Sequence, residues 1–518
     1  MADSRTKNTK RNIVWGVVNK VLLALLPFII RTIIIKEIGV EYVGLNSLFT
    51  SILNVLSLAE LGFNTSVIFV MYRGVANDDT IKLSALLGYI KRVYLVIGTV
   101  ITIFGLLCTP FLRSIIHDVD KLPEDINIYV IYLILLANIT IGYFFGAYRN
   151  SLFCAYQRND IVSNIGTGTQ LFFSTLQILL LIFFKNYYIY IITLPFITLS
   201  QNYLYVRISK KLYPKITPYG TLSVEEKKEL KKLVTGTFIG KIGGVLSVSL
   251  DNIVISAFLG ITILAYYSNY HYILTTIQGF LVLIYSSMQG AIGNSLITES
   301  LEKNRSDLHN FTFIYNWIVG ICTFCLYFLI QPFIYLWIGK EGMLPDIIVI
   351  LLCVYFFITL SFGIQGTYKQ ALGIVWEDRY RPLVGGLVNI ALKIMFVLFL
   401  RQYGDTYSLI GVLLSTIIAQ TFVNTPWGVY VTYKGYFKTG QKRYYGAILT
   451  YFVVTIAVCA VCIPIFNLLP TSSGGIGVLY IMIRLFAAIV LSNALFILIY
   501  HKTLQYKIAK QYILERIK

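Results

Sequence analysis

Charged side chains are scarce in this sequence of 518 residues. Asp, Glu, Lys and Arg together make up 13% of it, whereas soluble globular domains carry about 25%. Apolar residues make up 57%, and the mean hydropathy is +0.73. This composition excludes a soluble globular protein and favours an integral membrane protein that crosses the bilayer several times.

Soluble catalytic motifs are also missing. The segment from Gly435 to Lys442 has the glycine spacing of a phosphate-binding loop, but it lacks the Lys-Ser/Thr pair and a preceding strand. No cleavable signal peptide is visible, because the first apolar run is too long for one. We therefore expect no enzymatic activity and no ATP hydrolysis, and we assign no catalytic residue, metal or cofactor.

Disulfide and metal chemistry are not indicated by the cysteines. The seven cysteines mostly lie within or at the ends of apolar runs, and two pairs have C-x-x-C spacing without a second ligand pair in a loop. They are Cys108, Cys154, Cys322, Cys325, Cys353, Cys459 and Cys462. We interpret them as small packed side chains.

Long apolar runs are what the sequence does contain. A helix needs about 20 apolar residues to cross the hydrocarbon core, where every backbone polar group must be satisfied internally. We find about fourteen such runs, so the predicted fold is an all-α polytopic membrane protein. The predicted spans are 13–36, 42–72, 84–109, 127–148, 161–184, 187–208, 234–259, 265–295, 310–338, 346–370, 382–400, 408–432, 444–466 and 476–500.

Basic residues between the spans predict the orientation. Lys and Arg are retained on the cytoplasmic side, and they cluster in Arg207 to Lys232, Lys434 to Arg443 and Lys502 to Lys518. With both termini inside, roughly thirty of the 43 basic residues lie in inner segments and roughly six in outer ones. The net charge of +19 is therefore a topological signal, and it does not require a nucleic-acid partner.

The chain contains an internal repeat. A shift of 221 positions superposes Lys20 on Lys241 and Gly39 on Gly260, and the span boundaries follow the same shift. At a shift of 220, residues 147–152 (AYRNSL) resemble residues 367–372 (TYKQAL). Two lobes of six spans each account for this pattern, and an even number gives both lobes the same orientation, as in transporters with parallel repeats.

The repeat predicts four parts of the chain. Residues 1–208 form an N-lobe, 209–233 a basic cytoplasmic linker, 234–433 a C-lobe, and 434–518 two additional spans with a cytoplasmic tail. A pseudo-two-fold axis along the membrane normal would relate the two lobes, with a substrate path between them.

Two polar stripes are related by the same shift. Residues at helical spacing in the second span align with residues that can all form hydrogen bonds. The aligned sets are Ser47, Thr50, Ser51, Asn54 and Ser57, and Ser268, His271, Tyr272, Thr275 and Gln278. We expect Asn54, Ser57, Thr275 and Gln278 to line a wet cavity, and the alternative is hydrogen bonding between packed helices.

Basic residues within the spans suggest what the cavity holds. Lys20, Arg31 and Lys241 lie in apolar runs, where a charge costs several kcal/mol unless it faces protein or water. Lys20 and Lys241 at matching depth favour an anion. Snorkelling to the membrane surface is the alternative for Arg31, and the repeat places Asn252 at the matching position.

Acidic residues within the spans are fewer. Glu60 and Asp251 are candidates for a proton or sodium site, and the alternative is an ion pair with a buried cation. His271 is a weaker candidate for proton coupling.

Two segments of the first lobe resemble a known family. Residues 38–49 (IGVEYVGLNSLF) and 56–62 (LSLAELG) resemble the first outer turn and second span of the multidrug/oligosaccharidyl-lipid/polysaccharide (MOP) exporter superfamily. The chain looks most similar to the bacterial Wzx-type flippases for repeat units of O-antigen and capsule.

The resemblance implies a substrate, a mechanism and a location. The substrate would be an oligosaccharide on undecaprenyl pyrophosphate, moved by alternating access from the inner to the outer leaflet of the bacterial cytoplasmic membrane. Partners would be this lipid-linked oligosaccharide, the bilayer, a polysaccharide polymerase and chain-length proteins. The buried cations would then hold the pyrophosphate.

Three alternatives stay open. A multidrug antiporter of the same superfamily would favour an acidic cavity, whereas the charges within these spans are mostly basic. A flippase for lipid II has a similar architecture and substrate chemistry. A polytopic polymerase or glycosyltransferase would need carboxylates or a metal near an outer face, where the short loop 110–126 offers Asp118, Asp120, Glu124 and Asp125.

Overall fold

The computed structural model describes residues 24–60, 63–117, 119–374, 376–469 and 477–517. Over these ranges the chain consists of helices and short connections, and no residue is in a strand. The predicted all-α class is confirmed. The chain forms two compact units, Met1–Ala265 and Tyr266–Lys518.

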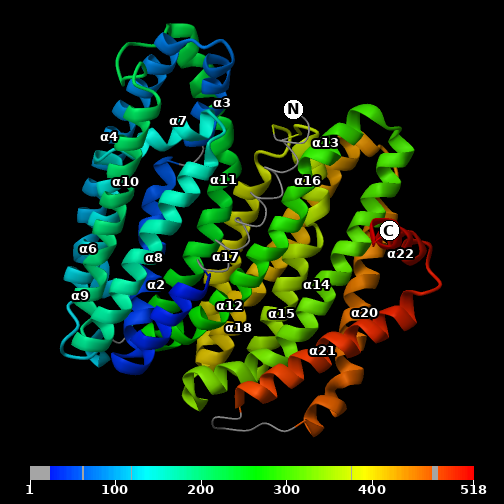
Figure 1. Ribbon diagram of the computed structural model, residues 1–518. Coiled ribbons are helices and arrows are strands. Elements are labelled where there is room, and N and C mark those ends of the chain that lie inside the picture. Colours follow the sequence, from blue (N-terminus) through cyan, green and yellow to red (C-terminus); the bar gives the residue numbers. More distant parts are fainter. Residues whose placement is uncertain (1–23, 61–62, 118, 375, 470–476, 518) are drawn as a thin grey trace. The chain divides into compact units, whose positions relative to one another are not determined.

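The first unit is built from helices that run in alternating directions (Figure 1). Within it, α6 packs on α4 and α10, α8 packs on α10, and α11 packs on α2 and α3. Its helices are 24–37, α2 (Val40–Leu56), η1 (Ser57–Glu60), α3 (Phe63–Ala76), α4 (Thr80–Cys108), α5 (Leu112–Ile115), α6 (Ile128–Phe144), η4 (Ala147–Arg149), α7 (Asn150–Ala155), α8 (Asn159–Phe184), α9 (Tyr187–Ile191), α10 (Thr193–Leu212) and α11 (Val224–Leu259).

The second unit contains most of α12 and all helices after it. Within it, α14 packs on α15, α20 and α21, and α18 packs on α15 and α17. Its helices are α12 (Ile261–Ser287), α13 (Gln289–Thr298), α14 (Leu301–Ile338), α15 (Asp346–Ser361), α16 (Gly363–Ala371), α17 (Arg381–Leu400), α18 (Asp405–Ala419), η7 (Gln420–Asn424), α19 (Thr425–Thr432), η8 (Tyr433–Phe437), α20 (Gln441–Leu468), α21 (Gly477–Tyr500) and α22 (Leu504–Ile517).

Membrane-spanning helices are abundant. Among the described residues, 11 helices are long and apolar enough to cross a membrane, and a twelfth results if α6 and the η4–α7 segment, bent by 52°, form one span. These correspond to the twelve predicted spans from 84–109 to 476–500. The predicted span 13–36 lies partly outside the described residues, and 42–72 is divided into α2, η1 and α3. The count of fourteen is not confirmed.

Two glycines mark equivalent helix starts in the repeat. Gly39 precedes α2 with a φ of 152°, and Gly260 precedes α12 with a φ of 95°. Side chains rarely adopt this part of φ/ψ space, so a glycine allows the chain to reverse there at little steric cost. The two positions are those that the 221-residue shift superposes.

The predicted linker is partly helical and is packed against the first unit. Helix α11 begins at Val224, where Ser223 and Glu226 form a capping box. Lys82 of α4 pairs with Glu226 at 2.8 Å, and Arg73 of α3 pairs with Glu229 at 3.1 Å. These contacts explain why α11 belongs to the first compact unit. The lobe boundaries inferred from the repeat stay a prediction.

The last two spans pack on the second unit through aromatic side chains. Phe328 of α14 stacks on Phe466 of α20, with ring centroids 4.1 Å apart. Trp317 of α14 contacts Phe496 of α21 at 5.7 Å. Helices α20 and α21 therefore share a core with α14.

Gly44 in α2 lies very close to Ile261, the first residue of α12. A Cβ atom at Gly44 would lie 2.4 Å from the carbonyl oxygen of Ile261, at the start of α12. We predict that Gly44→Ala lowers the free energy of unfolding by about 1–3 kcal/mol, because the added methyl group overpacks this contact. The measurement is the thermal unfolding midpoint in detergent relative to the wild type.

Gly166→Ala in α8 is the matched control, since a Cβ there would meet no atom within 4 Å. We expect its midpoint to equal or exceed that of the wild type. Equal midpoints for Gly44→Ala and the wild type would contradict the close approach of α2 and α12.

Candidate functional site

A carboxylate held by two tyrosines is the central polar feature of the first unit. The hydroxyl of Tyr94 in α4 donates to Glu60 Oε1 at 3.1 Å, and the hydroxyl of Tyr143 in α6 donates to Glu60 Oε2. The two rings pack edge to face with centroids 5.5 Å apart. Both tyrosines are buried, so the carboxylate is fixed between three segments of the unit.

Ser57 belongs to the same cluster. Its hydroxyl donates to the carbonyl of Leu53 at 2.9 Å and also interacts with the hydroxyl of Tyr143. The 3₁₀ turn Ser57–Glu60 brings the two polar residues together at the end of α2. Two residues predicted for different roles, Ser57 for the cavity and Glu60 for ion coupling, therefore lie in one site.

The Glu60 carboxylate has lone pairs that the two tyrosines do not use. A carboxylate has about four lone-pair sites, and the tyrosines use two of them. Within the described part of the chain, no Lys or Arg forms an ion pair with Glu60. The two alternatives for Glu60, a proton or sodium site and an ion pair with a buried cation, both stay predictions.

The structure does not describe the side chains of the two lysines that are predicted to bind an anion. Lys20 lies outside the described residues, and Lys241 lies in α11 with a side chain that is not described. Arg31 is half-buried in the helix 24–37, within electrostatic range of Tyr187 and Tyr190. The anion-binding role of these three residues stays a prediction.

The remaining predicted residues are divided between the two units. In the first unit Asn54 is exposed, and Asp251 is buried in α11, where the neighbouring Asn252 donates to Ser51 at 2.9 Å. In the second unit Thr275 is exposed and donates to the carbonyl of His271 at 2.9 Å.

Gln278 has a buried side-chain nitrogen with no hydrogen-bond partner among the described residues. An unpartnered buried amide is costly, so a ligand or water at this position would stabilise the protein. This observation is compatible with the predicted wet cavity.

Two buried cations occupy equivalent positions of the repeat. Arg149 follows the bend after α6 and is 3% exposed, and Lys369 in α16 is 9% exposed. Nη1 of Arg149 donates to Ser209 Oγ at 3.1 Å. Sequence reasoning aligned these residues without assigning them a role, although the match of a basic residue at a 220-residue shift was a usable signal.

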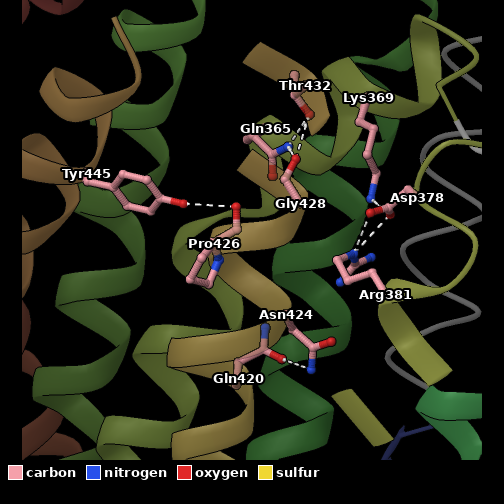
Figure 2. A network of polar contacts seen from close by, with 10 residues as sticks. All are labelled: Gln365, Lys369, Asp378, Arg381, Gln420, Asn424, Pro426, Gly428, Thr432 and Tyr445. Atoms are coloured by element: carbon pink, nitrogen blue, oxygen red, sulfur yellow. Dashed lines mark hydrogen bonds and ion pairs between the residues drawn. The ribbon is translucent and has the colours of Figure 1, made fainter. Parts of the chain in front are cut away.

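Lys369 belongs to an ion-pair network in the second unit (Figure 2). Asp378 is 5% exposed and lies between Lys369 and Arg381, accepting from Nζ of the lysine and, at 2.8 and 2.9 Å, from Nε of the arginine. One carboxylate thus neutralises part of the charge of two cations and joins α16 to the start of α17.

Two further basic residues within the spans are buried. Arg484 of α21 is 7% exposed and donates to the carbonyls of Phe466 and Leu469 at 3.2 and 2.6 Å. It caps the C-terminal end of α20, where cations are favoured. Lys393 of α17 is fully buried. Carbonyl oxygens therefore hold the charge of Arg484 inside the protein.

Comparison with solved structures identifies the class of fold. The lipid II flippase MurJ in an inward closed conformation matches with a TM-score of 0.64 and 15% identity, covering 94% of this chain and 98% of that chain. An inward-facing MATE multidrug transporter of the MOP superfamily matches with a TM-score of 0.55 and 15% identity, over 80% and 96% of the two chains. The fold is therefore that of MOP-superfamily transporters.

A Vibrio cholerae MATE transporter has the same fold, with a TM-score of 0.50 and 15% identity over 82% of this chain and 95% of that chain. A search of curated proteins gave no match in sequence. A family model described as "Polysaccharide biosynthesis protein" matches residues 9–288, which is more than half of the chain. The chain belongs to this polysaccharide biosynthesis family, and it is a multi-pass membrane protein.

Asp378 tests the energetics of the buried network. We predict that Asp378→Asn lowers the free energy of unfolding by about 3–5 kcal/mol, because Lys369 and Arg381 lose their shared counter-ion. The measurement is the thermal unfolding midpoint of the purified protein.

Glu377→Gln is the control, since it removes one carboxylate from the adjacent, exposed position, which forms no ion pair with any described residue. We expect it to change the midpoint little. Equal midpoints for the two variants would show that the network does not stabilise the fold.

Proposed function

We propose that this protein is a flippase for a lipid-linked oligosaccharide. The substrate is a repeat unit on undecaprenyl pyrophosphate, moved from the inner to the outer leaflet of the bacterial cytoplasmic membrane. The product enters O-antigen or capsule synthesis, where a polymerase and chain-length proteins receive it. Both chain termini face the cytoplasm in this proposal.

The observation that carries the proposal is the match to the polysaccharide biosynthesis family over residues 9–288, in a chain with a transporter fold. A protein of polysaccharide synthesis that consists almost entirely of membrane helices is suited to moving a glycan across the bilayer. The basic residues within the predicted spans, Lys20, Arg31 and Lys241, favour an anionic substrate over the cationic drugs of an antiporter.

The proposed mechanism is alternating access. Lys20, Arg31 and Lys241 neutralise the pyrophosphate, which is costly to bring into a low-dielectric environment without counter-ions. Asn54, Ser57, Thr275 and Gln278 provide hydrogen bonds for sugar hydroxyls. Glu60, held by Tyr94 and Tyr143, and Asp251 are candidates for coupling transfer to a proton or sodium gradient.

Transfer between leaflets in proteoliposomes tests the function. Purified protein is reconstituted with a defined undecaprenyl-pyrophosphate oligosaccharide, with lipid II, or with a cationic dye, and the substrate in each leaflet is quantified. We expect transfer of the oligosaccharide lipid above that of protein-free liposomes. Faster transfer of lipid II or of the dye would overturn the proposal in favour of one of those substrates.

The two repeat-related lysines give a sharper prediction. Lys20→Ala and Lys241→Ala should each slow oligosaccharide-lipid transfer about tenfold, because each loses a charged contact of about 1.5 kcal/mol or more. Protein amounts in the vesicles are matched by immunoblotting. Lys36→Ala, at an exposed position, is the control. Wild-type transfer by the Lys20→Ala/Lys241→Ala double variant would exclude these lysines from anion binding.

Glu60 gives a prediction about coupling. We expect Glu60→Gln to abolish the acceleration that an imposed proton or sodium gradient gives to the wild type, because the amide can form hydrogen bonds but cannot ionise. The rate should then equal the rate without a gradient. Glu41→Gln, in the first turn of α2, is the control. An unchanged response to both gradients would refute coupling at Glu60.

A further inference from the structure

A large cavity lies within the second unit. It has a volume of about 1030 Å³ and is lined by the helical segment from Phe422 to Lys438, by Ile374 and Glu377, and by Gln441 at the start of α20. Pockets for small ligands commonly have volumes of roughly 300–1,000 Å³, so this one can hold a headgroup the size of a sugar phosphate.

One wall of the cavity is aromatic. Trp427 and Tyr430 of α19 and Phe422 of η7 line it, and Phe422 and Tyr430 are 73% and 49% exposed. Exposed aromatic rings bind the apolar faces of sugar rings and lipid chains, and they can stack without strict geometry. Gln441 and Glu377 add hydrogen-bonding groups to the same cavity.

The end of the cavity is cationic. Lys434 lies with its Nζ 5.4 Å from the ring centroid of Tyr430, and Lys438 donates to the carbonyls of Lys434 and Gly435 at 3.0 and 3.3 Å. Within the described ranges, neither lysine forms an ion pair with a carboxylate. Both ammonium groups can therefore accept an anionic ligand.

Two π-helical turns shape the aromatic wall. η7 and η8 flank the eight residues of α19, and Pro426, which lacks an N–H group, follows the first of them. Such turns insert an extra residue and change the direction of the side chains, and they are frequent at functional sites. The side chains of α19 thus point differently from those of a continuous helix.

The walls are held in place by buried hydrogen bonds and ion pairs (Figure 2). Gln365 of α16 donates to the carbonyl of Gly428 at 3.0 Å and to the hydroxyl of Thr432. Tyr445 of α20 donates to the carbonyl of Pro426 at 3.2 Å. The pair formed by Lys369 and Asp378 anchors the segment that carries Glu377. The cavity is therefore preformed, which lowers the entropic cost of binding a ligand.

We propose that this cavity is a binding site for the sugar-phosphate headgroup of a lipid. Lys434 and Lys438 bind the phosphate, and Tyr430, Trp427 and Phe422 stack on the sugar and the first part of the chain. The inference rests on the proposed function, because the lipid-linked sugar is taken to be the transported substrate. The loops around 374–377 and 433–441 face the cytoplasm in the predicted topology, so the site captures substrate before transfer.

Photo-crosslinking tests this site. The full-length protein in phosphatidylcholine nanodiscs is labelled with a farnesyl-diphosphate-linked N-acetylglucosamine that carries a diazirine, and labelled peptides are identified by mass spectrometry. We expect labelling within residues 422–441. Tyr430→Ala and Lys434→Gln should each raise the half-saturating probe concentration at this segment about fivefold, since each removes a stacking or charged contact.

Two matched controls separate the cavity from general surface effects. Tyr407→Ala removes a tyrosine with 51% exposure, against 49% for Tyr430, and Lys442→Gln removes an exposed lysine outside the cavity. For both control variants, the half-saturating probe concentration at residues 422–441 should equal that of the wild type. Labelling unaffected by Tyr430→Ala and Lys434→Gln, or weakened equally by the controls, would overturn the proposal.

Competition distinguishes the ligand classes. Unlabelled probe should displace the label, whereas inorganic pyrophosphate and phosphatidylglycerol should require far higher concentrations. Equal displacement by phosphatidylglycerol would mean that the site binds any anionic lipid. Equal displacement by pyrophosphate would mean that it binds the free anion. Either result overturns the proposal.

If the wild type transfers the glycan lipid but is labelled only outside residues 422–441, the capture site alone is wrong. If it neither transfers nor is labelled, the proposed function fails as well.

Discussion

The cost of an isolated charge in an apolar environment constrains the whole of this structure. Arg149, Lys369 and Arg484 are buried among membrane helices and are held by a carboxylate or by carbonyl and hydroxyl oxygens. Asp378 joins Lys369 and Arg381, carbonyl groups at the end of α20 accept from Arg484, and Ser209 accepts from Arg149. These contacts join α16 to the start of α17, and α20 to α21.

The same constraint separates structural charges from functional ones. Asp378 is paired with two cations inside the protein, so the Lys369–Asp378–Arg381 network supports the walls of a cavity. Glu60 is different, because it is held by the neutral hydroxyl groups of Tyr94 and Tyr143. Lys434 and Lys438 are exposed and line a cavity, and neither pairs with a carboxylate among the described residues. We propose ion coupling at Glu60 and ligand binding at Lys434 and Lys438 for that reason.

Much of the fold could be predicted from the sequence because apolar length is enough to define a membrane helix. Twelve predicted spans correspond to described helices, and the repeat pair Gly39 and Gly260 marks equivalent helix starts. The bend after α6 and the division of the span 42–72 were not predicted from the sequence, because apolar composition does not indicate where a helix breaks.

The candidate sites were less predictable. Tyr94 and Tyr143 are 34 and 83 residues from Glu60 along the chain, so only the packing of α4 and α6 could bring them to the carboxylate. The pair Asp378 and Arg381, three residues apart, could have been suspected from local spacing. The cavity beside α19 depends on two π-helical turns, and no pattern of residue types in the sequence indicates them.

The central claim is that the basic residues within the membrane spans serve an anionic lipid carrier. The most direct measurement is leaflet transfer, in proteoliposomes, of one oligosaccharide attached to the same polyprenyl chain either through a pyrophosphate or through a neutral glycosidic bond. We predict transfer of the pyrophosphate form and only background transfer of the neutral form. Equal transfer of both forms would contradict the claim.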